Sequence, residues 1–518
     1  MRRRITLLQH ASTPYDPTQA HLSPDALSLR TLDAAREDRT TFALDEIPSE
    51  LRKVLQSCYQ LHVRWASERP AGAPAPFASR VSSGLHVLFT PGEGVDGDGE
   101  SLCQTLKQAF GDEVDCVSPE SSFITPPILS TRFAASTSSQ FYSRLPSLDS
   151  LIAYIERGVC ASSSDPDSCH QQAEALRSAD SLDINYDSIS HALTVSGFWD
   201  SAPQGGWTEE IAKPVRKGTD QIEVGLLGAE PAKEPEEIKM GGLLGVVGND
   251  DQLKPTLFSF PARHHDLPNE ATYSVSFPPP TGLHPTMTIS LPQASLHRPP
   301  APPDATCALH TYLTLPSTIF GDKYQLSTTD PLFLSSHNLA ALRAVAGETD
   351  LEAPDWSVSR WGSTWLLELA TPDPTSDEWN VTVPLHLRYL KPSESGIRSA
   401  AVPWPVVFWA CTAEDGTKMG VNPFDRANLG WDGLFGPRTM FYQLHPAPQP
   451  GAPLVEELEV PVLRLENEGI FQGKVIELAT VAVISLGFVW VLWKLGLVVR
   501  GSGGGVDARK REKRGKAE

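Results

Sequence analysis

Hydrophobic residues near the N-terminus follow both helical and extended patterns. Apolar positions three and four residues apart predict helices over 49–65, 101–111 and 147–158, and Gly111 is a plausible end for the second of these. Apolar and polar residues alternate over 85–89, and 182–199 has the pattern of two paired strands. We therefore expect residues 1–204 to form a mixed, α+β region.

The pattern changes twice after this region. Residues 205–256 are acidic and glycine-rich around "AEPAKEPEEIKMGG", and we interpret them as a connector with short strands. Residues 257–450 contain short β-type runs, among them "YSVSF", "TMTISL", "WLLELA" and "PVVFWACT", separated by proline-rich turns. The 45 prolines, nearly double the usual share of about 5%, also favour a loop-rich β architecture. We predict a mainly β, sandwich-like domain here, followed by a linker over 451–476.

One segment is apolar enough to cross a membrane. Leu478–Trp493 is uncharged, and counting on through Lys494 to Val499 gives 22 residues. At about 1.5 Å per residue they span about 33 Å, which suffices for a hydrocarbon core of about 30 Å. We predict a transmembrane helix over 477–499, with Trp490 and Trp493 at the membrane interface. Lys494 either reaches the headgroups or contacts a partner helix.

The charge distribution predicts the orientation of this helix. Residues 500–518 hold seven Lys or Arg and three acids, so this tail carries +4 and the preceding residues −24 of the net −20. The positive-inside rule places the tail in the cytosol and the acidic part on the lumenal side. The apolar run after "MRRR" is too short for a conventional signal peptide, so a tail-anchored protein with a cytosolic body is the alternative. An acidic protein of this kind repels nucleic acid, which we exclude as a partner.

Two further features bear on the compartment. The sequon Asn380-Val381-Thr382 lies in an alternating run that places Asn380 on the polar face of a strand, so we predict a glycan there. The seven cysteines have no metal-type spacing. Cys307 and Cys411 both lie in strand-like runs, and they either form a disulfide or are two small buried residues.

Sequence motifs for catalysis are weak. Asp96-Gly97-Asp98 and Asp165-Pro166-Asp167 match the D-x-D pair of metal-dependent glycosyltransferases, but both lie in loops of an acidic chain. The run His264-His265-Asp266 lacks a third ligand nearby, which favours a structural role. The G-x-S-x-G, P-loop and H-E-x-x-H motifs do not occur. We predict no catalytic, metal or cofactor-binding residues, and no cofactor.

Several stretches resemble the PIG-X family in its fungal form. They are "EVGLLGAEPAKEPEEIKMGGLLGVVG", "KPTLFSFPARHH", "PPPTGLHPTMTISL", "CALHTYLTLPSTIFGDKYQLS", "VPLHLRY" and "AVPWPVVFWACT". The resemblance is specific from Glu223 to Cys411 and weaker to Leu444. It implies a single-pass protein of the endoplasmic reticulum membrane with a large lumenal part.

The resemblance also implies a function. Members of this family are accessory subunits that stabilise the multi-span catalytic subunit of GPI mannosyltransferase I. That enzyme adds the first mannose to the glucosaminyl-phosphatidylinositol precursor in GPI-anchor biosynthesis. Two other functions stay open: a chaperone-like folding or processing factor for lumenal proteins, and an autonomous enzyme.

Two surfaces could contact the partner and the bilayer. Trp404, Phe408 and Trp409 either form a partner interface, as aromatic anchors often do, or fill the sandwich core. The membrane anchor is expected to include Leu478, Trp490, Trp493 and Lys494.

Overall fold

The structure, a computed structural model, describes most of the chain. The described residues are 1–9, 16–92, 99–127, 138–162, 165–214, 220–372, 378–413, 422, 424, 426, 428–464 and 472–514. Met1–Tyr389 and Ser399–Leu458 form one compact unit, called the body below, and Leu390–Arg398 with Glu459–Glu518 form a second unit. Strands account for 41% and helices for 23%, which confirms the mainly β class.

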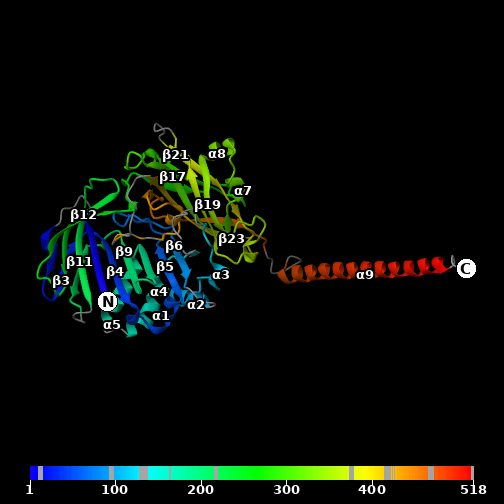
Figure 1. The fold of residues 1–518 in the computed structure, drawn as a ribbon, viewed down its shortest axis with the longest axis horizontal. Helices are drawn as coiled ribbons and strands as arrows, with labels where there is room; N and C mark the ends of the chain where they lie inside the picture. Colours follow the sequence, from blue (N-terminus) through cyan, green and yellow to red (C-terminus); the bar gives the residue numbers. More distant parts are fainter. Residues whose placement is uncertain are drawn as a thin grey trace. The chain divides into compact units, whose positions relative to one another are not determined.

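A ten-stranded sheet organises the N-terminal half of the body, in the order β13-β12-β11-β1-β4-β9-β8-β5-β6-β7 (Figure 1). Its strands are β1 (Arg2–Gln9), β4 (Ala35–Ala43), β5 (Cys58–Ala66), β6 (Gly84–Pro91), β7 (Ser139–Ser143), β8 (Ser181–Asp187), β9 (Ala192–Trp199), β11 (Gln221–Glu230), β12 (Glu237–Val246) and β13 (Lys254–Pro261). Neighbouring strands are antiparallel except β1 and β11, which pair in parallel from Arg2 opposite Gln221 to Gln9 opposite Gly228. The stretch 205–256, expected to form a connector, thus supplies β11, β12 and the start of β13 to this sheet.

Short helices cover one face of this sheet (Figure 1). They are α1 (Ser49–Gln56), α2 (Gly99–Phe110), α3 (Pro119–Ser122), α4 (Asp149–Tyr154) and α5 (Pro166–Ala175). Leu55, Leu106 and Ile152 of these helices share a buried core with Val87 and Leu182 of the strands. The predicted helix over 101–111 is confirmed, and it ends where Gly111 takes a left-handed φ of +100°.

The predicted helix over 49–65 is wrong in its second half. The helix α1 ends at Gln56, and β5 begins at Cys58 between its neighbours β6 and β8. The hydroxyl of Ser57 donates to the carbonyl of Val54 (2.7 Å) at the end of the helix. Leu61, Val63 and Trp65 also have a spacing of two, and pairing with two strands outweighs the helical spacing of the same apolar residues.

A small sheet packs beside β1 and β11. It contains β2 (Ala20–Leu22), β3 (Ala26–Leu32) and β10 (Trp207–Ala212) in the order β10-β3-β2. Its Leu27 and Leu29 share a buried cluster with Ile5 and Val224 of the large sheet. The N-terminal strand is therefore anchored by apolar contacts as well as by hydrogen bonds.

The C-terminal half of the body contains two larger sheets. A six-stranded sheet has the order β14-β25-β24-β17-β20-β19, with β14 (His264–His265), β17 (Thr306–Pro316), β19 (Leu339–Gly347), β20 (Gly362–Leu369), β24 (Val406–Thr412) and β25 (Thr439–Gln443). A four-stranded sheet has the order β21-β16-β15-β26, with β15 (Thr272–Ser276), β16 (Thr286–Pro292), β21 (Glu378–Pro384) and β26 (His445–Pro446). Of these strands, β15, β16, β20 and β24 match the four runs given above for the predicted β-rich domain.

Short elements complete the fold. The strand pairs are β18 (Ile319–Phe320) with β22 (His386–Leu387), and β23 (Ile397–Pro403) with β27 (Val455–Pro461). The helices are α6 (Gln293–Leu296), α7 (Lys323–Leu326), α8 (Pro331–His337) and, in the second unit, α9 (Gly473–Arg514).

An aromatic cluster fills the interior beside the six-stranded sheet. Trp431 is completely buried, and its ring lies 4.3 Å from that of Phe408 and 4.9 Å from that of Phe441. Its indole nitrogen also donates to the carbonyl of Arg80 (3.3 Å), in a loop of the N-terminal half. Trp431 therefore connects the two halves of the body.

A chain of polar contacts, the polar seam, connects the same two halves. It consists of His62 and Arg64 on β5, Asp183 and Asn185 on β8, and Asn428. Arg64 is 2% exposed; it pairs with Asp183 and donates from Nε to the carbonyl of Asn428 (3.1 Å). His62 contacts Asn185 through Nδ1 (2.8 Å) and Asn428 through Nε2 (2.9 Å). In the polar seam, buried polar groups of β5 and β8 form hydrogen bonds with one another and with Asn428.

Asp432 gives the loop that reaches the seam a defined shape. Its carboxylate accepts from the backbone N–H groups of Asn428 (3.1 Å) and Leu429 (2.8 Å). Arg263 donates from Nη2 to the carbonyl of Asp432 (2.8 Å). These bonds hold Trp431, between them in sequence, in the aromatic cluster.

Replacing Trp431 with Ala should strongly destabilise the body. Loss of a fully buried Trp side chain costs about 3–5 kcal/mol of unfolding free energy. The measurement is thermal unfolding of the full-length protein in detergent. Trp356→Ala is the matched control, because Trp356 is 51% exposed and its loss should leave Tm nearly unchanged. Equal Tm values for the two variants would contradict the assignment.

Candidate functional site

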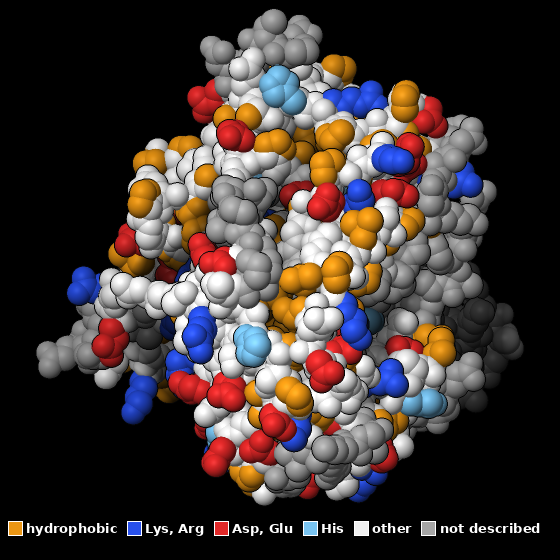
Figure 2. Space-filling view, turned by 90° about the vertical axis from the view of Figure 1, so that its left-hand side faces the viewer, with side chains coloured by type: hydrophobic (Ala, Val, Ile, Leu, Met, Phe, Trp, Pro, Cys, Tyr) orange, Lys and Arg blue, Asp and Glu red, His pale blue; other side chains and the backbone are white. Residues whose placement is uncertain are grey.

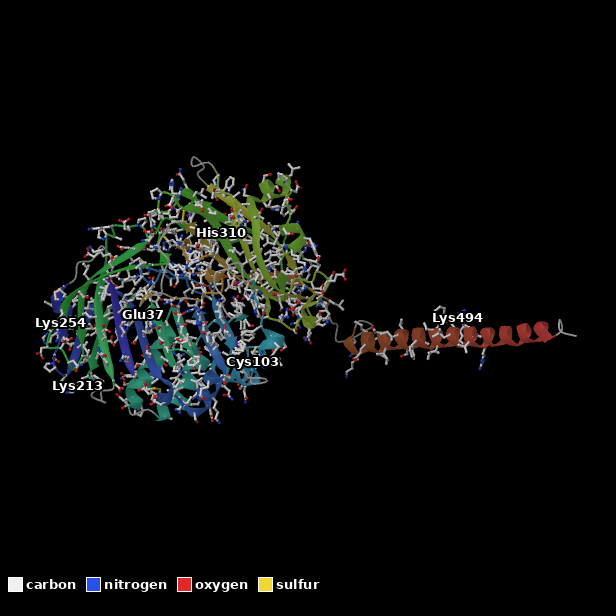
Figure 3. The ribbon with its side chains drawn as sticks, viewed as in Figure 1. Glu37, Cys103, Lys213, Lys254, His310 and Lys494 are labelled. Carbon is white, nitrogen blue, oxygen red and sulfur yellow. A yellow bond between two sulfur atoms is a disulfide. The ribbon has the colours of Figure 1, made fainter. Side chains whose placement is uncertain are left out.

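Charged side chains of both signs are interspersed over one face of the molecule (Figure 2). Lys213 pairs there with Asp25, and Lys254 pairs with Asp250, four residues earlier (Figure 3). Such exposed pairs contribute little to stability, about 0–1 kcal/mol each. Each of these two lysines thus has an acidic partner beside it.

The helix α9 has the properties of a membrane span. An 18-residue window within its segment Gly473–Arg500 has a mean hydropathy of 2.3, and α9 is the one helix among the described residues that is long and apolar enough to cross a membrane. The predicted anchor residues Leu478, Trp490 and Trp493 are exposed along it by 73%, 57% and 59%, as expected for side chains that face lipid. The chain therefore has the features of a single-pass membrane protein.

Lys494 lies on this helix (Figure 3). Its Nζ is 5.8 Å from the ring centroid of Trp490 and 5.5 Å from that of Trp493. A cation within about 6 Å of an aromatic face is attracted by the ring. This contact gives Lys494 a partner within its own helix.

The structure places Asn380 on the exposed side of β21, the edge strand of the four-stranded sheet. Its neighbours Val381 and Val383 are completely buried, as the alternation predicts. The backbone carbonyl of Asn380 accepts from the side-chain amide of Asn338 (2.8 Å). A glycan on the Asn380 side chain could therefore extend into solvent without disturbing the core.

Cys307 and Cys411 face each other on the paired strands β17 and β24, and they form a disulfide in the structure. Two further bridges, Cys103–Cys116 and Cys160–Cys169, were not anticipated from the sequence. Their pairing requires α2 and α5 to be placed first, and no sequence spacing shows this. Cys58 is a buried free thiol, and burial raises the pKa of this thiol to about 12.

The three aromatic residues considered as a partner interface lie in the interior. Trp404, Phe408 and Trp409 are 4%, 0% and 5% exposed. The indole of Trp409 donates to the carbonyl of Ser295 (3.0 Å), and that of Trp404 donates to the carboxylate of Glu456 (3.0 Å). These side chains cannot reach a partner from the folded body, so their role is packing.

The two histidines of the run His264-His265-Asp266 are also internal, whereas Asp266 is exposed. The Nε2 of His265 donates to the carbonyl of Ala262 (2.9 Å), and its ring stacks on Tyr442 with centroids 5.0 Å apart. The ring of His264 stacks on Phe441 at 5.4 Å. Within the described residues, no group of three or more His, Cys, Asp or Glu could hold a metal ion.

Of the two D-x-D pairs, the structure describes Asp165-Pro166-Asp167. Asp96-Gly97-Asp98 lies outside the described residues. Asp165 begins α5, where its carboxylate accepts from the backbone N–H of Ser168 (3.2 Å). This is the usual contact of a helix N-cap residue.

Comparison with known proteins gives the family. A family model described as PIG-X / PBN1 matches residues 280–496. The protein called Protein pbn1 of Emericella nidulans is 68% identical over 514 residues, which cover 97% of each chain. The chain belongs to the PIG-X / PBN1 family. Protein pbn1 of Neurospora crassa is 43% identical over 97% of this chain and 96% of its own length.

Relatives of lower sequence identity match a smaller part of the chain. Protein PBN1 of Yarrowia lipolytica is 30% identical over 241 residues, or 44% of this chain. A solved C-terminal domain of the Streptococcus agalactiae AgI/II polypeptide BspA aligns with a TM-score of 0.12 at 7% identity, too low to inform the fold. The relatives from Emericella nidulans and Neurospora crassa therefore match 97% of the chain, whereas the one from Yarrowia lipolytica matches less than half of it.

The buried histidines make stability depend on pH. Burial lowers the pKa of His62, His86 and His265 from 6.5 to about 4. The unfolded chain then binds more protons than the folded one between these values. The unfolding free energy should fall by about 1.4 kcal/mol per pH unit for each histidine as the pH drops from 6.5 towards 4, and by no more below it.

The variant His265→Phe tests this dependence while keeping an aromatic ring against Tyr442. Tm of the full-length protein is measured in detergent between pH 7.5 and 4, a window set by the pKa values of 6.5 and about 4. Its slope in acid should be shallower than that of the wild type. The exposed His191, replaced with Asn as a control, should leave the slope unchanged. An unaltered slope in His265→Phe would show that this histidine does not titrate as described.

Proposed function

We propose that this protein is a non-catalytic subunit of GPI mannosyltransferase I that stabilises the multi-span catalytic subunit. The observation that carries this proposal is the family match, which extends at 68% identity over 97% of the chain. In GPI-anchor biosynthesis the complex adds the first mannose to the glucosaminyl-phosphatidylinositol precursor, with dolichol-phosphate mannose as the donor. The single apolar span of α9 fits a subunit that is anchored beside a membrane enzyme.

The proposed location is the membrane of the endoplasmic reticulum, with the body in the lumen and the basic tail in the cytosol. Three disulfides in the body support a lumenal location, because disulfides persist in oxidising compartments and are rare in the cytosol. The exposed sequon at Asn380 supports the same side of the membrane. The basic residues of 500–518, which follow the apolar segment, support a cytosolic tail.

Endoglycosidase treatment tests the orientation. The wild type should gain mobility on a gel after treatment, whereas Asn380→Gln should run at the deglycosylated position throughout. This substitution keeps the backbone carbonyl to which Asn338 donates, so the strand should stay intact. Thr382→Ala would be a poorer choice, since the hydroxyl of Thr382 contacts Nδ1 of His337 (2.7 Å). Digestion of the body by protease added to sealed microsomes would place it in the cytosol and overturn the proposed role.

Depletion of the protein tests the function. Microsomes from depleted cells, supplied with dolichol-phosphate mannose, should accumulate glucosaminyl-phosphatidylinositol and lose its mannosylated product, together with the catalytic subunit. The level of an unrelated lumenal glycoprotein is the control, and it should be unchanged. Loss of several unrelated lumenal proteins with normal mannosylation would instead indicate a general folding factor.

A further inference from the structure

A cavity of about 80 Å³ lies inside the body, beside the polar seam. A water molecule needs at least about 10–15 Å³ of such space, so the cavity has room for several waters or one small oxyanion. Its wall includes residues of β5, of β8 and of the loop between β5 and β6, together with Arg426 and Leu429. Residues of both halves of the body therefore line the cavity.

Positive charge dominates the wall of this cavity. Among the described residues, four arginines line it (Arg64, Arg69, Arg80 and Arg426), against two acids, Asp180 and Asp183. Asp183 is shared: it pairs with Arg64 and lies 2.9 Å from Nε of Arg426. Asp180 lies 3.1 Å from Arg69. The lining thus has a formal charge of +2, although the chain as a whole carries −20.

Arg80 is the cation that lacks a counter-charge. No carboxylate of the described residues lies within 4.0 Å of its guanidinium, which donates from Nη1 to the carbonyl of Ala71 (2.6 Å). Its Nη2 contacts Nδ1 of His445 (3.1 Å). The Nε2 of His445 contacts the carbonyl of Leu267 (2.9 Å) and so carries the proton, which leaves Nδ1 as a neutral acceptor. Arg80 is partly shielded from water, and a cation in such a place without an adjacent carboxylate is costly.

Several hydrogen-bond donors on the same wall are also unused. The hydroxyls of Ser67, Ser82 and Ser181 and the Nη2 of Arg426 have no partner among the described residues. Ser67 and Ser82 are only 6% and 4% exposed, so bulk water cannot satisfy them. Buried donors of this kind normally have a partner.

We propose that this cavity binds a phosphate-type oxyanion. Such an anion supplies the adjacent negative charge that Arg80 lacks. Arginine suits this task because its guanidinium donates several hydrogen bonds in a fixed geometry that matches phosphate oxygens. Arg69 is 56% exposed and marks the side on which the cavity meets solvent. The anion is either free phosphate or the headgroup of a phosphate ester.

Binding can be measured as stabilisation of the full-length protein in nonionic detergent. Tm is recorded against inorganic phosphate and against potassium chloride of the same ionic strength. A ligand of the folded state raises stability in proportion to ln(1 + [L]/Kd), so the rise in Tm should follow a binding isotherm. Phosphate also stabilises proteins in general by exclusion from their surfaces, so variants are needed to separate the two effects.

Arg80→Met should weaken the phosphate effect by about tenfold or more in Kd, because it removes a charged hydrogen-bond donor and keeps the apolar stem. The matched control is Arg177→Met, whose guanidinium is 54% exposed and pairs with Glu174 outside the cavity. It should respond to phosphate as the wild type does. If Arg80→Met does not fold, Arg80→Gln makes the same test, because it also removes the positive charge.

Three probes distinguish free phosphate from the headgroup of a phosphate ester as the bound anion. Inorganic phosphate, glycerol 3-phosphate and mixed micelles containing phosphatidylinositol are compared on the wild type and on the Arg80 variant. An Arg80-dependent effect of inorganic phosphate identifies free phosphate, and one confined to phosphatidylinositol identifies a lipid headgroup. An equal response of all variants, or no response beyond that to chloride, would show that the cavity holds only water and would overturn the proposal. Neither result bears on the mannosylation assay, so the two proposals fail separately.

Discussion

The fold of the body depends on the contact between Arg64 and Asp183 and on the loop that this pair holds. Arg64 is almost completely buried, and it pairs with Asp183 while donating to the carbonyl of Asn428. A buried ion pair adds little net stability over apolar packing, but removal of one partner leaves an unpaired charge and costs about 3–5 kcal/mol. The pair therefore restricts which arrangement of the loop is tolerated. The loop in turn places Trp431 against the six-stranded sheet, so packing in the C-terminal half depends on a charge in the N-terminal half.

Local patterns predicted much of the fold. The alternation around Asn380 correctly separates exposed from buried positions, because both belong to a strand with one face in solvent. Alternation could not show whether Phe408 and Trp409 lie in the core or at a partner interface. In β24 every residue from Val406 to Cys411 is buried, so no alternation distinguishes an interface from a core. A strand covered on both faces is apolar throughout, whatever covers it.

The polar seam and the arginine-lined cavity were beyond sequence reasoning for a different reason. Arg64 and Asp183 are 119 positions apart, and Arg64 and Asn428 are 364 positions apart. Each is an ordinary polar residue in its own segment, and only the strand order brings them together. The family resemblance, by contrast, was recognisable in the sequence because it depends on contiguous runs of residues.

The parallel pairing of β1 with β11 has a consequence for how the protein is made. Strand β1 begins at Arg2, but its partner begins at Gln221, and the loop that reaches Arg64 comes later still, at Asn428. Contacts so distant in sequence slow folding, because the chain loses the entropy of closing a long loop before the contact can stabilise it. During synthesis the first strand therefore has one edge unpaired until about half of the chain has emerged. Such an edge invites association with other chains, so the nascent protein should depend on chaperones before its membrane helix is synthesised.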